Sequence, residues 1–238
     1  MATGAFAAES TLSAQNIMQQ FNLVVFGSAT STSDVDGRSF IGGSVSGGTY
    51  ATSNLMTSSY PGLIVKGSAS NVMVNSQGTV VGGSIANSTI NNGSSAIMGS
   101  SSNTSYNGAG VTYVAGTVQG GNLNQTRLTS LSQNATLQQE VATTDAMAAT
   151  TMKSSLGALS SQLSKLQATG SYTVDNKNKV TFNATANTSG IAVIDLTGSN
   201  SNTLTAFKKF AFNVDKSIST LVFNVDSSNI AIAANFLA

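Results

Sequence analysis

A five-residue pattern recurs along the first half of the chain: an apolar residue, any residue, Gly, Ser or Thr, and a small or β-branched residue. The glycines of successive copies are 16, 24, 16, 16 and 17 residues apart, so one period of about sixteen governs the segment. The longer interval holds eight extra residues, which include Tyr60-Pro61-Gly62 and the only proline. The six copies are Val25-Phe26-Gly27-Ser28-Ala29, Ile41-Gly42-Gly43-Ser44-Val45, Val65-Lys66-Gly67-Ser68-Ala69, Val81-Gly82-Gly83-Ser84-Ile85, Ile97-Met98-Gly99-Ser100-Ser101 and Val114-Ala115-Gly116-Thr117-Val118.

A short fixed period that is rich in glycine and β-branched residues predicts a β-solenoid, in which each repeat forms one coil stacked on the last. We expect the apolar residue to point into a narrow core and the glycine to turn a corner, where φ is allowed to be positive. The Ser or Thr that follows is expected to hydrogen-bond to the turn or to its own copy in the next coil. Chance recurrence of Gly-Ser and disorder are the alternatives, and the regular spacing argues against both.

The hydrophobic pattern divides the chain into four segments. Residues 1–21 contain a short helix within Ser10–Phe21, which is expected to cap the open end of the stack. Residues 22–123 form the repeat solenoid, 124–169 a helical segment, and 170–238 further strands that continue or flank the solenoid. We expect a single structural domain with a mainly β fold: a β-solenoid of about six coils, one or two long α-helices packed alongside, and C-terminal strands.

The helical segment carries one apolar stripe, formed by residues spaced 4, 3, 4 and 3 apart. An uninterrupted helix over the whole segment would be longer than the stack of coils. We therefore expect a break near Thr143–Met147 and two helices, the second of which lies along the stack and covers one face. A coiled-coil partner is the alternative explanation of the stripe. The stripe consists of Met152, Leu156, Leu159, Leu163 and Leu166.

Strand-like segments return after Gly170, and a motif repeats among them: Phe212-Asn213-Val214-Asp215 recurs as Phe223-Asn224-Val225-Asp226. We expect its Asn and Asp residues to serve turns. The last segment, residues 229–237, is apolar, uncharged and free of proline, so as an unpaired strand it would be prone to association. We therefore expect end-to-end association, with a strand donated by the light residues Met1–Ser10.

Charge is scarce: only 8% of residues are charged, against roughly 25% in ordinary soluble domains. Lys66 is the sole charged residue between Ser39 and Thr126, so Ser, Thr, Asn and Gln must cover the solenoid surface. A net charge of +1 offers no basic surface for nucleic acid or anionic lipid, and no apolar run is long enough to span a membrane. Ala5-Phe6-Ala7 resembles a signal-peptidase site without its apolar region.

The usual components of catalysis are missing from the composition. Without histidine or cysteine there is no Ser-His-Asp triad, thiolate metal site or disulfide. The solenoid has too few acids and bases for carbohydrate cleavage, and its glycines are not followed by the helix and lysine of a phosphate loop. We therefore expect no enzymatic activity, no cofactor, and no catalytic or metal-binding residues. Asp34 and Asp36 invite a calcium hypothesis, and a polar turn in which Arg38 pairs with an aspartate is the alternative.

Several segments together resemble the choice-of-anchor A family of bacterial adhesive domains. The resemblance covers most of the chain and implies a secreted or surface-attached protein with a role in adhesion or matrix building. The departure is at the C-terminus, where a sorting tail is expected and none is present. The family resemblance rests on Gln20-Phe21-Asn22-Leu23-Val24-Val25-Phe26-Gly27, Ser33-Asp34-Val35-Asp36-Gly37-Arg38, Ile41-Gly42-Gly43, and Leu156–Leu166 followed by Ala168-Thr169-Gly170.

The sequence thus predicts a non-enzymatic extracellular adhesive or matrix protein of bacterial biofilms, with itself as the expected partner in a homo-oligomer or filament. A monomeric surface adhesin is the alternative; it would hold a glycan or a matrix protein on a solenoid face or on the loop at Tyr60-Pro61-Gly62. An ice-binding solenoid is a third possibility. It would need regular Thr-x-Thr ranks on a flat face, and Thr203-Leu204-Thr205 is not repeated.

Overall fold

The computed structural model describes residues 12–53, 58–175, 178–200, 203–226 and 235–237. The expectations for Ala5-Phe6-Ala7, for Met1–Ser10 and for most of the C-terminal apolar segment therefore concern residues outside these ranges. The chain forms two compact units, residues 1–156 and 157–238. The division between them falls inside the segment predicted to be helical.

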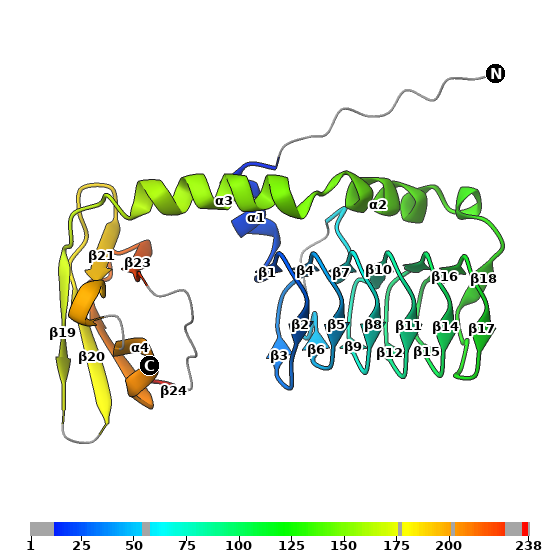
Figure 1. The fold of residues 1–238 in the computed structure, drawn as a ribbon, viewed down its shortest axis with the longest axis horizontal. Helices are drawn as coiled ribbons and strands as arrows, with labels where there is room; N and C mark the ends of the chain where they lie inside the picture. Colours follow the sequence, from blue (N-terminus) through cyan, green and yellow to red (C-terminus); the bar gives the residue numbers. More distant parts are fainter. Residues whose placement is uncertain (1–11, 54–57, 176–177, 201–202, 227–234, 238) are drawn as a thin grey trace. The chain divides into compact units, whose positions relative to one another are not determined.

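The first unit is a β-solenoid, as the sixteen-residue period predicted (Figure 1). The first five coils each contribute one short strand to each of three parallel sheets, here called sheets A, B and C, and the chain then adds two more strands to sheet A and one to sheet B. Sheet A contains β1 (Leu23–Val25), β4 (Ser39–Ile41), β7 (Leu63–Val65), β10 (Thr79–Val81), β13 (Ser95–Ile97), β16 (Val111–Val114) and β18 (Thr126–Leu128). Sheet B contains β2 (Ala29–Thr30), β5 (Val45–Ser46), β8 (Ala69–Ser70), β11 (Ile85–Ala86), β14 (Ser101–Ser102) and β17 (Val118–Gln119). Sheet C contains β3 (Asp34–Val35), β6 (Thr49–Tyr50), β9 (Met73–Val74), β12 (Thr89–Ile90) and β15 (Ser105–Tyr106).

Register within the stack follows the sequence repeat. The apolar residues that open each copy pair with one another, for example Ile41 with Val65 and Val65 with Val81. The eight extra residues of the second coil lie between β6 and β7 and leave this register unchanged. The apolar side chains stack in the interior, where Tyr50 and Tyr106 are fully buried.

The repeated glycine does turn a corner, between sheets A and B, but the expected positive φ is wrong for it: Gly83 is outside the left-handed region. Left-handed residues occur instead at the corner between sheets B and C, where Asn71, Asn87 and Asn103 have φ of 55°, 50° and 48°. Asparagine tolerates this conformation better than most residues with a side chain. The side-chain amide of Asn103 also donates to Asn87 in the coil before it (3.3 Å).

Helices cover the outer face of sheet A in the first unit. Helix α1 (Ala14–Gln20) is capped by Ser13, whose hydroxyl accepts from the backbone of Asn16 (3.2 Å). Its buried Ile17 packs with Phe40 of β4 and Ile64 of β7. The expected short helix is therefore present, but its buried contact is with the side of the stack and not with the core at its end.

A break between two longer helices is confirmed. The short helix η1 (Leu131–Gln133) leads into α2 (Ala135–Ala146), and α3 (Ala149–Leu163) follows after an extended Met147. The break has a physical reason: the extended backbone at Met147 places its side chain in the buried cluster with Phe40 and Ile64.

The helix that lies along the stack is α2, not the second helix as expected. Figure 1 shows α2 running along the strands of sheet A. Leu137 and Val141 of α2 pack on Val80 and Ala96 of sheet A. Of the apolar stripe, Met152 and Leu156 pack on the first unit. The other three leucines lie in the second unit, so the expectation that the whole stripe packs on the solenoid is wrong for Leu159, Leu163 and Leu166.

The second unit has two sheets of its own. Sheet D has the order β19 (Gly170–Val174), β20 (Lys179–Ala184), β22 (Lys209–Val214), β24 (Asn235–Leu237), and sheet E pairs β21 (Ile191–Asp195) with β23 (Thr220–Asn224). Only the β19–β20 pair is antiparallel among these described strands. The two sheets enclose an aromatic core around Phe182 and Phe210, and the short helices η2 (Gly198–Asn200) and α4 (Thr203–Ala206) lie in the connections. No helix in the described part of the chain is long and apolar enough to cross a membrane.

Candidate functional site

The aspartates of the calcium hypothesis are both exposed. Asp36 accepts a hydrogen bond from the Thr52 hydroxyl (2.6 Å). The buried Arg38 donates to the carbonyl oxygen of Tyr60 (3.1 Å) and to the side chain of Gln77. Across the described residues, no three or more His, Cys, Asp or Glu side chains gather as metal ligands. The calcium hypothesis gains no further ligand from this arrangement.

The Gly-Ser step of the repeat interlocks neighbouring coils, as expected for the serine. The hydroxyl oxygen of Ser68 accepts the backbone N–H of Ser84 (3.2 Å), and that of Ser84 accepts the backbone N–H of Ser100 (3.0 Å). The glycine leaves the space that this contact requires, because a Cβ at Gly83 would lie 2.5 Å from the Ser68 hydroxyl oxygen. The same N–H to hydroxyl bond joins Ser44 to Ser28, Ser68 to Ser44 and Thr117 to Ser100.

These hydroxyls form one of two ranks on the outer side of sheet B. Along each strand of this sheet the first residue points into the core and the second points outward, for example buried Ile85 and half-buried Ala86. Together the two ranks make a surface that we call the hydroxyl face. Its corner rank is Ser28, Ser44, Ser68, Ser84, Ser100 and Thr117, and its strand rank is Thr30, Ser46, Ser70, Ala86, Ser102 and Gln119.

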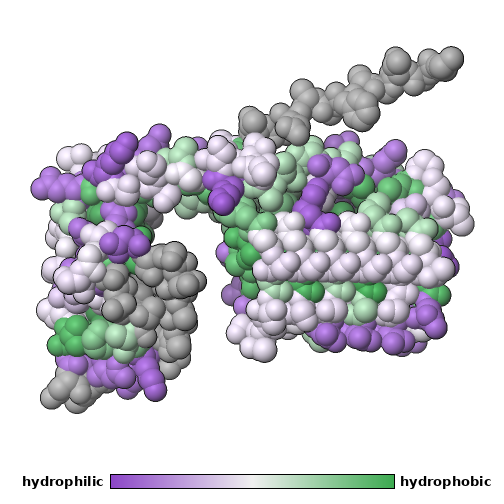
Figure 2. Space-filling view, in the orientation of Figure 1, coloured by the Kyte–Doolittle hydropathy of each residue, from purple (hydrophilic) through white to green (hydrophobic). Residues whose placement is uncertain are grey.

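The hydroxyl face is uncharged and shallow. A groove of about 590 Å³ runs over it, from Ser28 and Thr30 to Ser100 and Ser102. In Figure 2 the front of the solenoid shows regular rows of weakly polar, pale atoms crossed by a narrow hydrophobic strip. Lys66, the sole charge in this part of the sequence, donates instead to the carbonyl oxygen of Thr144 in α2 (2.9 Å).

The hydroxyl face is organised for contact with hydroxyl groups. The hydroxyl oxygen of each corner serine accepts a backbone N–H of the next coil, so its position is fixed while its hydrogen remains available to a ligand. The Thr117 hydroxyl at the end of the rank instead donates to the Ser100 hydroxyl oxygen (3.3 Å). Neighbouring coils repeat these donors about 4.8 Å apart. The arrangement offers many weak, evenly spaced contacts and no charged group.

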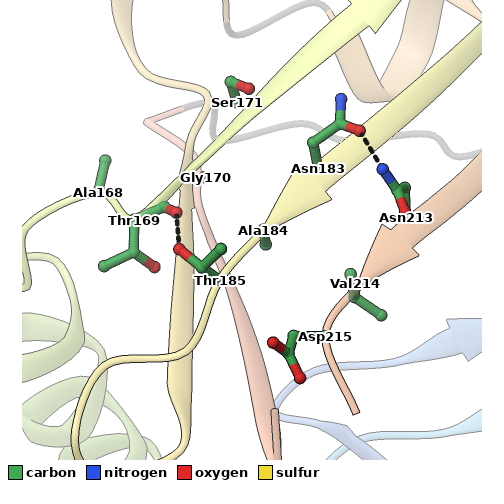
Figure 3. Close-up of a pocket in the computed structure, with 10 residues that line it drawn as sticks. All are labelled: Ala168, Thr169, Gly170, Ser171, Asn183, Ala184, Thr185, Asn213, Val214 and Asp215. Atoms are coloured by element: carbon green, nitrogen blue, oxygen red, sulfur yellow. Dashed lines mark hydrogen bonds between the residues drawn. The ribbon is translucent and has the colours of Figure 1, made fainter. Parts of the chain in front are cut away.

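A second concave surface lies in the second unit, at one edge of sheet D (Figure 3). It has a volume of about 640 Å³, and we call it the strand-end pocket. It lies where β19 begins and where β20 and β22 end. Its walls are Ala168, Thr169, Gly170, Ser171, Asn183, Ala184, Thr185, Asn213, Val214 and Asp215.

Sequence reasoning named a solenoid face as a possible ligand surface but not which face, and it missed the strand-end pocket. The signal for the hydroxyl face was present, since Ser44-Val45-Ser46, Ser68-Ala69-Ser70 and Ser100-Ser101-Ser102 occupy equivalent places in the repeat. The search for an ice-binding pattern considered Thr-x-Thr alone and so passed over these serines. The strand-end pocket had a weaker signal in the repeated Phe-Asn-Val-Asp motif.

Comparison with known protein families identifies the family of this chain. A family model described as "Putative Ice-binding-like adhesive domain" matches residues 14–238. The coarse expectation of an adhesive domain is thereby confirmed, whereas the choice-of-anchor A assignment is not supported by this match. A search of curated proteins and a search of solved structures each found no match.

Proposed function

Because the chain belongs to the ice-binding-like adhesive domain family, we propose that it is a surface adhesin that holds a neutral, hydroxyl-rich solid or polymer against its hydroxyl face. The single observation that carries this proposal is the regular rank of fixed serine hydroxyls, from Ser28 to Ser100, on an uncharged face. A polysaccharide surface is the ligand class that matches it, since sugar hydroxyls both donate and accept hydrogen bonds.

The mode of binding follows from the surface chemistry. A single hydroxyl contact exposed to water contributes little, so affinity must come from many contacts made together. A flat ligand with its own regular spacing can make these contacts without a deep pocket. An adhesive family also indicates an extracellular or cell-surface location, and we propose that the domain is secreted and acts by binding alone, without catalysis.

Binding of the full chain to microcrystalline cellulose and chitin tests this proposal. The variants Ser70→Arg and Ala86→Arg place a bulky charge on the strand rank without entering the core, and both should weaken sedimentation with the polysaccharide at least tenfold. Thr89→Arg, in the same coil but on sheet C, is the matched control and should bind like the parent. Equal binding by all four proteins, or none by the parent, would refute the proposal.

Ice binding is a second candidate for the same face, favoured by its flat ranks of small side chains. The corner rank has one threonine, Thr117, and the strand rank one, Thr30; serine is less restricted at χ1 than threonine, which makes the outward rank less rigid. An ice-recrystallisation assay decides between the candidates. Inhibition by the parent that is lost in Ser70→Arg would favour ice over polysaccharide.

We also retain self-association as a proposal. The strands at the ends of the stack, β1 to β3 at one end and β17 and β18 at the other, pair on one side only among the described residues, and open strand edges favour association. Deletion of Met1–Ser10 tests the donated strand. Loss of polymers with retained β-structure supports it, while unchanged assembly, or no polymer from the parent, refutes it.

A further inference from the structure

The strand-end pocket brings polar side chains from neighbouring strands to one edge of sheet D. Asn183 of β20 and Asn213 of β22 are register partners, and the Asn213 amide nitrogen donates to the Asn183 side-chain oxygen (2.9 Å; Figure 3). Asp215 follows β22 directly, and Ser171 stands on β19. These side chains line one cavity together.

Several hydrogen-bonding groups in this pocket have no partner among the described residues. The Asn183 side chain is not one of them: its oxygen accepts from Asn213, and its nitrogen donates to the carbonyl oxygen of Thr181 (3.4 Å). The Asn213 side-chain oxygen and the Ser171 hydroxyl remain available, and the Asp215 carboxylate has more acceptor sites than its hydrogen bonds from Ser217 occupy. The Thr185 hydroxyl donates to the carbonyl oxygen of Thr169 (3.2 Å) and can still accept.

The repeated motif provides an internal comparison. In sheet E the amide nitrogen of Asn224 donates to the carbonyl oxygen of Leu163 (3.3 Å), and Asp226 accepts the backbone N–H of Gly198 (2.9 Å). Those contacts tie the motif to connections in its own unit. At the equivalent positions in sheet D, the Asn213 side chain bonds to Asn183, and the Asp215 carboxylate accepts hydrogen bonds within its own turn, from the backbone N–H (2.9 Å) and the side chain of Ser217.

We propose that the strand-end pocket binds one ring of a neutral sugar, with Asn213 and Asp215 as the principal contacts. A sugar presents adjacent hydroxyls that need both donors and acceptors, and the amide and carboxylate in the lining of this pocket supply them. Val214, which is 39% exposed, adds an apolar side chain to the lining of the pocket. The described lining residues include a carboxylate and no cation, which disfavours acidic sugars.

The ionisation of Asp215 agrees with this role. Hydrogen bonds from the backbone and side chain of Ser217 lower the pKa of this carboxyl group from its ordinary value. Asp215 is therefore a charged acceptor at neutral pH, and hydrogen bonds to charged acceptors are the stronger ones. This site is independent of the hydroxyl face, so a glycan chain could engage either surface.

Ligand-observed NMR on the full chain tests the inference, with galactose, glucose, mannose and N-acetylglucosamine as neutral probes and galacturonic acid as the acidic probe. We expect at least one neutral sugar to bind with a Kd of about 1 mM, and galacturonic acid to bind at least tenfold more weakly. Asn213→Ala and Asp215→Ala should each weaken neutral-sugar binding at least tenfold. Thr173→Ala, an exposed position on β19 outside the lining, should not change it.

Two further measurements keep the result unambiguous. Asp215→Asn preserves the size of the side chain and should weaken binding less than Asp215→Ala, which separates loss of contact from loss of fold. Ser70→Arg on the hydroxyl face should leave sugar binding intact. The inference is overturned if no neutral sugar binds, if Asn213→Ala binds like the parent, or if Ser70→Arg abolishes binding, which would assign the sugar to the hydroxyl face.

Discussion

The ammonium group of Lys66 donates a hydrogen bond of 2.9 Å to the carbonyl oxygen of Thr144, in the last turn of α2. It also lies 3.5 Å from the carbonyl oxygen of Asp145. The last carbonyls of a helix have no partner within the helix and carry the negative end of its dipole. One lysine in an otherwise uncharged stretch of coils thus fixes the end of the helix that covers sheet A.

Replacing Lys66 by Met should keep the apolar stem and remove the cap. We expect the free energy of unfolding to fall by about 1 kcal/mol, with a lower melting temperature in calorimetry. Lys153→Met, on the exposed side of α3, is the control and should change stability little. An equal effect of the two changes would mean that the contact of Lys66 with α2 contributes nothing specific.

Replacing Gly83 by Val should be severely destabilising, by more than about 3 kcal/mol, because the new Cβ would lie 2.5 Å from the Ser68 hydroxyl oxygen and 3.0 Å from the Gly67 carbonyl. Gly27→Val provides a matched control at the first copy of the repeat, where a Cβ would meet no atom within 4 Å. Urea denaturation of both variants measures the difference. If Gly83→Val melted like Gly27→Val, the interlock would not be the reason for the glycine.

Burial raises the pKa of Glu140 to about 7, from an ordinary value near 4.5. The folded state therefore binds this proton more tightly than the unfolded state between these values, so stability should fall as pH rises from about 5 to 8. We expect a loss of about 1 to 2 kcal/mol, less than the full shift implies because the side chain keeps contact with solvent. Denaturation at pH 5 and pH 8 measures it, and in Glu140→Gln the difference should largely vanish. A parent with equal stability at both pH values would contradict this expectation.

The position of the unit boundary within α3 predicts unequal effects along its apolar stripe. Met152 is 1% exposed and packs with Phe40 and Ile64, so Met152→Asp should destabilise the solenoid unit by more than about 3 kcal/mol. Leu159 is only half-buried, and Leu159→Asp should cost less and leave the solenoid unit folded. Hydrogen exchange of the sheet A amides distinguishes the two variants. Loss of protection in both would show that the stripe acts as one surface.

The sequence was informative where a contact repeats with the chain period. Gly83 and Ser84 belong to a five-residue pattern whose spacing alone predicts stacked coils. Stacking places each serine hydroxyl next to its copy in the neighbouring coil, where the hydrogen bond forms. The reason why glycine is required at the repeated position was predicted wrongly. The spacing of the glycines does not distinguish a need for a left-handed φ from a lack of space for a side chain. The residues with left-handed φ at a corner are Asn71, Asn87 and Asn103, which follow the same sixteen-residue spacing.

Features that depend on contacts outside the repeat were harder to predict. Leu137 and Val141 hold α2 on the solenoid with a weaker pattern than the leucine stripe of α3, so the wrong helix was expected to lie along the stack. A solenoid face was expected as a possible ligand surface, but the hydroxyl face could not be singled out, because serine is common in this chain and its role depends on which of the three sheets it lies on. The strand-end pocket joins residues that are distant in sequence, Ser171 and Asp215 among them, and only the pairing of β19, β20 and β22 brings them together.

The Gly-Ser contact is the same between successive coils: the glycine leaves space, and the serine hydroxyl of one coil accepts a backbone N–H of the next. Duplicating or deleting one sixteen-residue unit would need no new packing solution, and the two ranks of hydroxyls would simply lengthen or shorten by one step. Because weak contacts made together strengthen binding, each added coil that carries these hydroxyls would raise the avidity while the fold stays the same. The avidity of such a domain can therefore be adjusted, in evolution or by design, through the number of its coils.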